Sequence, residues 1–340
     1  MAPAQVMTAT EAPSITTLPL VAGPLVEYRP IHPTFGAEAT ADFSSITSEL
    51  VDEIKQGLAK YGVLVFRKTG LDDARHVEMS HLFGDLDDIA PFVSGLGQKN
   101  RLTSDYLFDV GNVNPDGTVM QPGTMRDLLL RCNYHFHADS AFNPRRAGIS
   151  LLLAHELPPA ELGGDTEFAD TRSAYEHLSE GRKEQIKDWV VMNSQLQCRR
   201  NANTDKNGAL NPLLDTDEFD PMKHRFGIHR LVQLHEPSGR TNLYIAAHAH
   251  HVEGMGIEEG QKELKGLLEY VDQPKYTFRV KWRDPGDLVV WDNTCVLHRS
   301  VPGSYAGKYK RDLRRTTVHD MGPQAWGLNE VGATWRNGLD

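Results

Sequence analysis

The stretch YTFRVKWRDPGDLVVWD, residues 276 to 292, shows the pattern on which the fold depends. Two runs of aromatic and β-branched residues stand on either side of a Pro-Gly turn, which is typical of strands joined by a short connection. Paired runs recur in RLVQLHEPSGRTNLYIA, residues 230 to 246, a strongly apolar run occurs at residues 147 to 157, and RRTTVHD, residues 314 to 320, is expected to be a final strand. Many short strands separated by turns predict a β-sandwich or a jelly roll.

Helical patterns flank these strands. Apolar residues at helical spacing predict a helix within residues 45 to 61, and VLVF at residues 63 to 66 predicts a buried strand. A second helix is expected to begin after Asp72 and to stop at Gly84, and a third covers residues 257 to 271. We therefore expect a mainly β fold with helices packed outside it.

The chain is predicted to form one domain. Residues 1 to 24 are rich in Ala, Pro, Ser and Thr without periodicity, so they are expected to be a flexible tail. Residues 25 to 340 would then form a single domain. Two long, turn-rich stretches, near residues 89 to 130 and 199 to 224, are predicted to be rim loops that select the substrate, because such loops are usually functional.

Charge and hydropathy exclude several classes of partner. The chain has 36 Lys and Arg against 46 Asp and Glu, a net charge of −10, and nucleic-acid binding would normally require a basic surface. No apolar run approaches the length of a membrane span, and the first residues lack a secretory signal pattern. The prediction is a cytoplasmic protein with neither a nucleic-acid nor a membrane partner.

Three widely separated cysteines, Cys132, Cys198 and Cys295, form no CxxC pair. An odd and sparse set does not indicate a disulfide framework. We therefore expect three reduced thiols, as is usual in the cytoplasm.

The stretch NYHFHADSAF, residues 133 to 142, indicates a metal site. On an extended strand His135, His137 and Asp139 would project from the same face. Burying these polar side chains is costly unless a ligand binds them. His298 follows an apolar strand and a turn, and can supply a further ligand. Two histidines and one carboxylate, here His137, Asp139 and His298, are the facial ligand set of non-haem Fe(II) oxygenases.

Other assignments compete with this one. His135 could replace Asp139 as a ligand or support one by hydrogen bonding. His248, His250 and His251 could form a zinc site of a hydrolase, although no cysteine or fourth ligand accompanies them.

Neighbouring residues have open roles of their own. Asp292 and Asn293 either orient His298 or form the turn before it, while Trp282 and Trp291 are expected in the core.

Arginines gather near the end of the chain. Arg311, Arg314 and Arg315 surround the start of the last strand, and a guanidinium forms two-pronged pairs with carboxylates. This suits a dicarboxylate cosubstrate such as 2-oxoglutarate. Arg314 should face away from Arg315 on a regular strand, as a surface charge.

At this point the sequence resembles the taurine dioxygenase and 2,4-dichlorophenoxyacetate dioxygenase (TauD/TfdA) family. The resemblance rests on ordered segments that span most of the chain: GVLVFRKTG, FHADSAF, GGDTEFAD, GRTNLYIAAHAHHVEGM, GDLVVWDNTCVLHR and RDLRRTTVHD. It implies a double-stranded β-helix (jelly-roll) core, Fe(II) as the metal, 2-oxoglutarate as cosubstrate and O₂ as oxidant.

The resemblance also implies roles for individual residues. His137, Asp139 and His298 match the metal ligands. Thr166 and Arg311 match residues that bind 2-oxoglutarate, while Arg315 and Asn133 match positions that contact substrate.

The implied function is a dioxygenase that oxidises, by hydroxylation, a C–H bond of a small carboxylate-bearing substrate, with succinate and CO₂ as coproducts. Within the class, an amino acid or a sulfonate could be the substrate, and desaturation or cyclisation could be the outcome. An alternative of another class is a jelly roll that binds a metal or small acid without catalysis. A homo-oligomer is possible.

Overall fold

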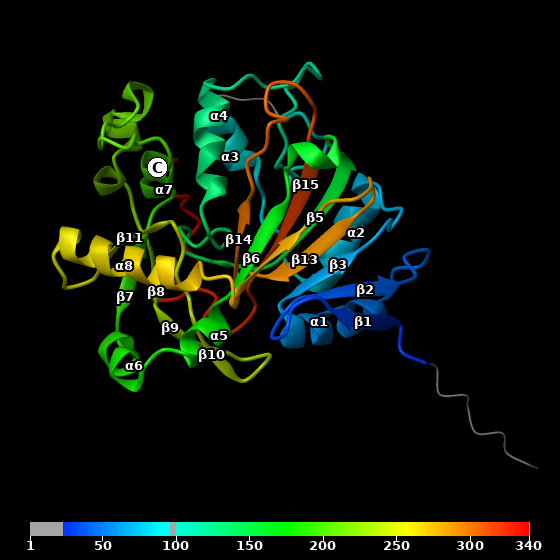
Figure 1. The fold of residues 1–340 in the computed structure, drawn as a ribbon, viewed down its shortest axis with the longest axis horizontal. Coiled ribbons are helices and arrows are strands. Elements are labelled where there is room, and N and C mark those ends of the chain that lie inside the picture. The colour runs from blue at the N-terminus through cyan, green and yellow to red at the C-terminus, as the bar shows by residue number, and fades with distance from the viewer. Residues whose placement is uncertain (1–22, 96–99, 340) are drawn as a thin grey trace, which may run out of the picture.

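The computed structural model describes residues 23–95 and 100–339, and a seven-stranded sheet lies at its centre (Figure 1). All neighbouring strands of this sheet are antiparallel except β2 and β3. In spatial order the sheet contains β1 (Val26–Pro30), β2 (Ala37–Ala41), β3 (Val63–Phe66), β13 (Leu288–Asp292), β5 (Ala147–Glu156), β15 (Asp312–His319) and β4 (Phe108–Asp109).

Three smaller sheets complete the β structure of the described residues. Each is antiparallel throughout. The first contains β12 (Thr277–Val280), β6 (Thr166–Asp170) and β14 (Val296–Ser300), the second β11 (Ala249–Val252), β7 (Val190–Asn193) and β8 (Gly227–Arg230), and the third β10 (Arg240–Leu243) and β9 (Val232–His235).

Apolar residues on both faces of the central strands explain the layering. In β3, Leu64 and Phe66 pack against helices α1 (Ser48–Tyr61) and α2 (Asp73–Phe83). The alternating residues Val63 and Val65 face the opposite way and pack with Phe168 of β6 and Val296 of β14. Because successive side chains of a strand point to opposite faces, the seven-stranded sheet is covered by helices on one side and by the sheet of β6, β12 and β14 on the other.

The predicted helices form where their capping residues allow. The Thr47 and Asp72 side chains accept hydrogen bonds from backbone N–H groups in the first turns of α1 and α2. Gly62 ends α1 with a φ of +71°, a backbone conformation that glycine adopts without steric cost. The predicted helix over residues 257 to 271 is α8 (Ile257–Val271), so these sequence predictions are confirmed.

The rim segments contain more helix than the sequence predicted. In the two segments lie α3 (Ala90–Gly95), α4 (Met125–Leu130), the end of α7 (Gln195–Ala202) and several short 3₁₀ turns. The described chain is therefore a mixed α/β fold with several sheets. Its remaining helices are α5 (Thr171–Glu176) and α6 (Glu180–Ile186), and its 3₁₀ turns are Arg131–Tyr134, Ala160–Leu162, Pro212–Leu214, Asp217–Phe219 and Pro221–Lys223.

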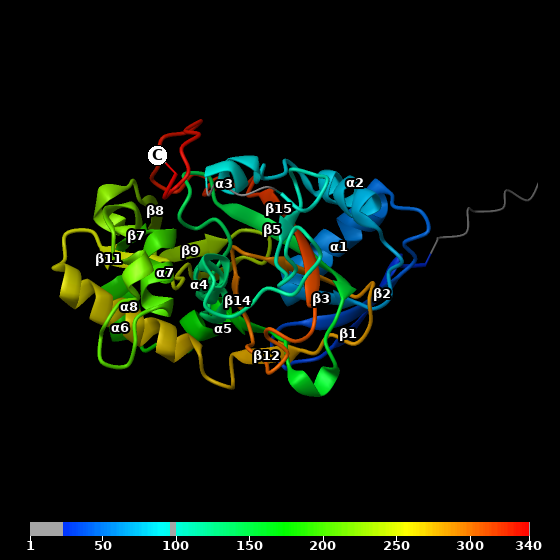
Figure 2. The same cartoon turned by 90° about the horizontal axis from the view of Figure 1, so that it is seen from above.

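Figures 1 and 2 show how these parts surround the middle of the molecule. The seven-stranded sheet with α1 and α2 lies on one side, α7, α8, the sheet of β7, β8 and β11 and the strands β9 and β10 lie on the other, and the sheet of β6, β12 and β14 lies between them. Most of the predicted tail, residues 1 to 22, lies outside the described residues. Within residues 23–95 and 100–339, no helix is long and apolar enough to cross a membrane.

Candidate active site

Three predicted residues, His137, Asp139 and His298, meet in the interior. All are buried, and their candidate ligand atoms lie within 4.8 Å of one another. Oδ1 of Asp139 is 4.0 Å from Nε2 of His137 and 3.7 Å from Nε2 of His298. The 161-residue separation in sequence is closed by a backbone bridge between the two histidines, with N–H···O distances of 3.0 and 2.9 Å.

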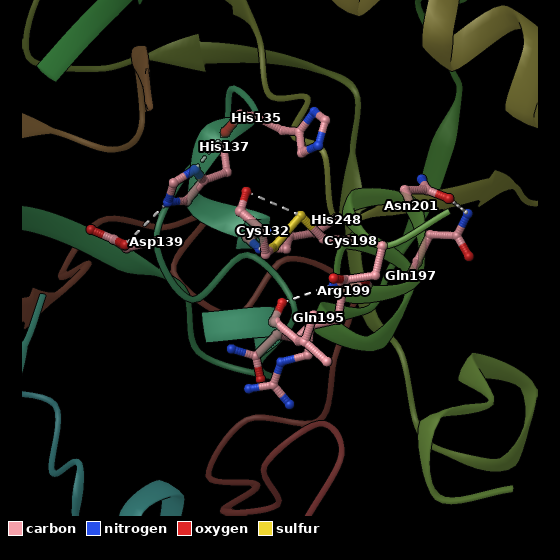
Figure 3. Close-up of a disulfide and its surroundings, with 12 residues drawn as sticks. Cys132, His135, His137, Asp139, Gln195, Gln197, Cys198, Arg199, Asn201 and His248 are labelled. Atoms are coloured by element: carbon pink, nitrogen blue, oxygen red, sulfur yellow. Dashed lines mark hydrogen bonds and ion pairs between the residues drawn. A yellow bond between two sulfur atoms is a disulfide. The ribbon is translucent and has the colours of Figure 1, made fainter. Parts of the chain in front are cut away.

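The chain around His137 sets the orientation of its ring. Nδ1 lies 2.8 Å from the carbonyl oxygen of His135 and donates to it. This leaves the lone pair of Nε2 directed toward Asp139, as a metal ligand requires (Figure 3). The neutral imidazole is favoured as well, because burial lowers the pKa of His137, and that of His298, below the usual value.

A chain of hydrogen bonds holds the Asp139 carboxylate. Ser150 donates its hydroxyl to Oδ2 of Asp139 at 2.7 Å, and Asn293 donates its amide to the Ser150 hydroxyl at 2.9 Å. The amide oxygen of Asn293 also accepts the backbone N–H of Asp139 at 3.0 Å. Oδ1 is therefore the oxygen left to face the imidazoles.

Arg315 is the positive charge beside this carboxylate. Its Nη1 lies 2.5 Å from Oδ1 of Asp139, and its guanidinium stacks over the Phe108 ring. Burial alone would raise the pKa of Asp139, but its neighbours, chief among them the Arg315 guanidinium, hold it at about 2. An ionised carboxylate beside two neutral imidazoles is the donor set that a divalent ion takes, so these residues fit a metal.

A cavity of about 390 Å³ adjoins the candidate ligands. His137 and Asp139 lie in its wall, so a metal held there would keep open positions toward the cavity. Apolar and charged side chains form the rest of the wall. They include Ile89, Phe92, Leu129 and Phe142 among the apolar residues, and Arg101, Arg126, Arg199 and Arg315 among the charged ones.

Arg311 lies in a second, smaller cavity. It is 3 % exposed, its Nε donates to the carbonyl oxygen of Gly164 at 2.9 Å, and it pairs with no carboxylate among the described residues. Gly164 has a φ of +94°, and a Cβ at this position would lie 3.3 Å from the Arg311 side chain. Asn133 lines both cavities, so the two are adjacent.

Thr166 lies at the start of β6, three residues before Ala169, which pairs with Leu297 of the neighbouring strand β14. It is buried, and its hydroxyl accepts a hydrogen bond of 3.2 Å from Nε1 of Trp282. Among the residues with predicted roles, Thr166 and His298 line neither of these two cavities.

One of the alternative histidine assignments agrees with the structure, because the His135 carbonyl oxygen accepts the hydrogen bond that orients His137. The others are not supported. His135 does not share a face with His137, because the chain there is a 3₁₀ turn and a bridge rather than a strand, and its exposed side chain points away from Asp139 (Figure 3). His250 and His251 contact each other through their Nδ1 atoms, while His248 lies in the cavity wall near His137. The described residues therefore contain no cluster of these three histidines.

The prediction of three reduced thiols is wrong for two of them. Cys132 and Cys198 form a disulfide, and Cys295 is free and buried. The two cysteines are 66 residues apart in sequence, so the sequence alone did not indicate that they pair. The packing of α7 against the 3₁₀ turn Arg131–Tyr134 brings their Cα atoms to a distance of 5.4 Å. The disulfide thus joins α7 to the segment that precedes His137 (Figure 3).

Other neighbouring residues differ in detail from the expectations. Arg314 faces away from Arg315 as predicted, but it is an ion-paired group between Asp312 and Asp73 rather than a free surface charge. Asn293 supports Asp139 instead of orienting His298. The predicted core positions of Trp282 and Trp291 are confirmed.

Sequence reasoning missed several residues of the site. Ser150 lies in β5, where its hydroxyl is the one polar side-chain group between Ala147 and Ala154 and thus an available signal. Gln195 and Arg199 lie four residues apart on α7, a helix that was not predicted. The only sequence signal for this pair was that both residues are polar and that they stand at helical spacing.

Two histidines and one carboxylate around an open cavity define the class of metal-dependent oxygenases. The family model "Taurine catabolism dioxygenase TauD, TfdA family" matches residues 27–317. The chain therefore belongs to the TauD, TfdA family.

Individual relatives agree with this. An alpha-ketoglutarate-dependent 2,4-dichlorophenoxyacetate dioxygenase of Cupriavidus pinatubonensis (strain JMP 134 / LMG 1197) is 35 % identical over 295 residues, which cover 86 % of this chain and 96 % of the relative. A (S)-phenoxypropionate/alpha-ketoglutarate-dioxygenase of Sphingobium herbicidovorans is 27 % identical, over 82 % of this chain and 90 % of the relative. The crystal structure of AAD-2 in complex with Mn(II) and N-oxalylglycine matches with a TM-score of 0.78 and 31 % identity, over 88 % of this chain and 99 % of that one.

The protein is thus an alpha-ketoglutarate (2-oxoglutarate)-dependent dioxygenase, an oxidoreductase that uses a metal and 2-oxoglutarate. The alternative of a jelly roll without catalytic activity is set aside. The predicted family, enzyme class and cofactors are confirmed.

Proposed function

We propose that this dioxygenase hydroxylates a C–H bond of a small, carboxylate-bearing acid of the aryloxyalkanoate type. The observation that carries the proposal is the buried cluster of His137, Asp139 and His298 at the wall of a cavity of about 390 Å³, with the Arg315 guanidinium beside it. A pocket of this size is typical of sites for small organic ligands. The matching relatives named for 2,4-dichlorophenoxyacetate and phenoxypropionate support this class of substrate.

We propose that His137, Asp139 and His298 hold Fe(II). When bound, the metal supplies, with O₂ and 2-oxoglutarate, the oxidation of a substrate C–H bond and leaves succinate and CO₂. The protein's part is to orient these ligands through His135, Ser150 and Asn293 and to exclude water with the apolar wall of the cavity.

Arg311 and Thr166 are proposed to bind the far carboxylate of 2-oxoglutarate. A buried guanidinium without an acidic partner among the described residues is costly, and a carboxylate would satisfy it. Burial lowers the pKa of Arg311, but an arginine still keeps its positive charge at neutral pH. Thr166 would turn its hydroxyl, which now accepts from Trp282, to donate to the same group.

Arg315 and Asn133 are proposed to contact the substrate. Arg315 pairs with Asp139 in the structure, and a metal at Oδ1 would compete for that oxygen. The guanidinium would then be available for the carboxylate of a substrate in the same cavity. Asn133 lines both cavities, which suits a residue between substrate and cosubstrate.

Further proposals concern the fold, the domain organisation, the location and the assembly of the protein. We propose that the seven-stranded sheet and the sheet of β6, β12 and β14 are the two faces of a jelly roll, because one apolar cluster fills the space between them. We also propose one domain over residues 25 to 340 with the rim segments 89–130 and 199–224 selecting the substrate, a cytoplasmic location, and a homo-oligomer as a possible assembly.

The test is succinate formation from 2-oxoglutarate with Fe(II) and ascorbate in air, across phenoxyacetates, phenoxypropionates, taurine and free amino acids. We expect stimulation by the aryloxy acids and none in a His137→Ala variant. Stimulation by taurine alone would contradict the substrate class, and unchanged turnover in His137→Ala would contradict the metal assignment.

A further inference from the structure

Arg199 is a second buried arginine of the large cavity. It lies on α7, next to the disulfide-bonded Cys198, and is 7 % exposed. Gln195, four residues earlier, lines the same cavity. Figure 3 shows the side chains of Gln195 and Arg199 on one face of α7, away from Gln197 and Asn201. Such a spacing places two side chains side by side on a helix.

The Arg199 side chain has no polar partner in the part of the chain that the structure describes. No hydrogen bond or ion pair involves its guanidinium there, and Nε is a buried donor without an acceptor. Burial is the cause that lowers the pKa of Arg199 to about 10, so it carries a positive charge at neutral pH. An unpartnered buried charge is costly, unless a ligand completes it.

The other arginines of the cavity wall are neutralised by carboxylates. Arg101 pairs with Asp109 and Asp312, and Arg126 also pairs with Asp109. Arg315 pairs with Asp139. Within the described residues, Arg199 is thus the arginine of this wall that has no carboxylate partner.

Arg199 and Arg315 reach the cavity from different elements. Arg315 lies on β15 of the central sheet, and Arg199 lies on α7 on the opposite side of the molecule's middle (Figures 1 and 2). A ligand that meets Arg315 near the metal site and extends across the cavity would therefore bring its far end to α7.

We propose that Arg199 and Gln195 form a second anion-binding subsite, and that the preferred substrate is a dianionic acid with one anionic group for Arg315 and another for Arg199. This inference rests on the proposed function and specifies its substrate. The guanidinium would take the second carboxylate in a charged, two-pronged pair, and the Gln195 amide would donate to the same group.

Phenoxyacetate and 4-carboxyphenoxyacetate are matched probes, because they differ by one carboxylate at the far end of the ring. Their dissociation constants can be measured by calorimetry under argon, on the protein loaded with Fe(II) and 2-oxoglutarate. We expect the diacid to bind about 10- to 100-fold more tightly, which is the effect of one hydrogen-bonded charge pair. In Arg199→Met the two acids should bind equally, with phenoxyacetate unchanged and the thermal midpoint not lowered.

Two variants serve as controls. Arg200→Met removes the neighbouring charge of α7, which is directed to Asp215 and the Leu214 carbonyl, and should keep the preference. Arg199→Lys keeps a charge without the planar fork and should retain a reduced preference.

Other results would overturn the inference. Equal binding of the two probes by the unaltered protein would do so, as would a preference that survives Arg199→Met. Weaker binding of phenoxyacetate in Arg199→Met would instead make Arg199 the site of a single carboxylate and would also overturn it. Failure of the proposed function is seen separately, as absence of Fe(II) and 2-oxoglutarate binding in the loading step.

Discussion

Replacing Arg311 with methionine tests whether its buried guanidinium binds 2-oxoglutarate. Methionine keeps the length and apolar stem of the side chain and removes the charge. The folded protein loses only hydrogen bonds to the carbonyl oxygens of Gly164 and Val110, because no carboxylate among the described residues pairs with Arg311. We therefore expect the variant to fold and to bind Fe(II).

The expected loss is large for 2-oxoglutarate. Arg311 is 3 % exposed, so a carboxylate bound to it would be largely removed from water. Removal of one partner from a buried charge pair costs about 3–5 kcal/mol, which corresponds to roughly a 10²- to 10³-fold increase in the dissociation constant. Arg311→Lys should lose less, because it keeps the charge but not the two-pronged geometry.

The assay is an anaerobic titration of the Fe(II)-loaded protein with 2-oxoglutarate, followed by the weak visible charge-transfer band. Lys310→Met is the matched control, since Lys310 is adjacent but lines neither cavity. It should bind 2-oxoglutarate like the unaltered protein. A dissociation constant within about threefold of normal in Arg311→Met, or a large loss in Lys310→Met, would refute the assignment of this arginine.

Three further predictions concern the metal, acid stability and the disulfide. Ser150→Ala removes the hydrogen bond to Oδ2 of Asp139 and should weaken Fe(II) binding about 10- to 100-fold in a metal-competition titration; unchanged affinity would contradict this role. Burial lowers the pKa of His229 to about 3, so the unfolded chain binds this proton first and stability falls as pH drops from about 6.5, by about 1.4 kcal/mol per pH unit. Urea unfolding at pH 6.5 and 4.5 should therefore show a smaller acid loss in His229→Gln, and an equal loss would be evidence against it. Thiol titration of the denatured, unreduced protein should find Cys295 alone, whereas three reactive thiols would exclude the Cys132–Cys198 disulfide.

The sequence was a good guide wherever the determining pattern was local. The helices α1, α2 and α8 and the buried strand β3 follow from apolar spacing and from capping residues such as Thr47 and Gly62. The opposite faces of Arg314 and Arg315 follow from the period of two in β15. These features depend on near neighbours, which a single sequence contains.

Contacts between segments that are distant in sequence were harder to predict. The prediction for His135 assumed a strand, but a 3₁₀ turn ends at Tyr134 and Ser140 adopts a φ of +51°, so the period of two does not hold there. Asn293 accepts a hydrogen bond from Asp139, which is 154 residues away in sequence. Both roles that the sequence suggested for Asn293 concerned its own turn and the nearby His298. The Cys132–Cys198 pair and the place of Arg199 both depend on how α7 packs, which local propensity does not determine.

The most direct test of the central claim is the stoichiometry of the reaction with a phenoxyacetate. Succinate and oxidised acid can be quantified together by mass spectrometry, with Fe(II), 2-oxoglutarate and air present, for the unaltered protein and for His298→Ala. We predict equal amounts of the two products in the unaltered protein and neither product in the variant or without Fe(II). Oxidised acid formed without succinate, or equal turnover in His298→Ala, would contradict a dioxygenase centred on His137, Asp139 and His298.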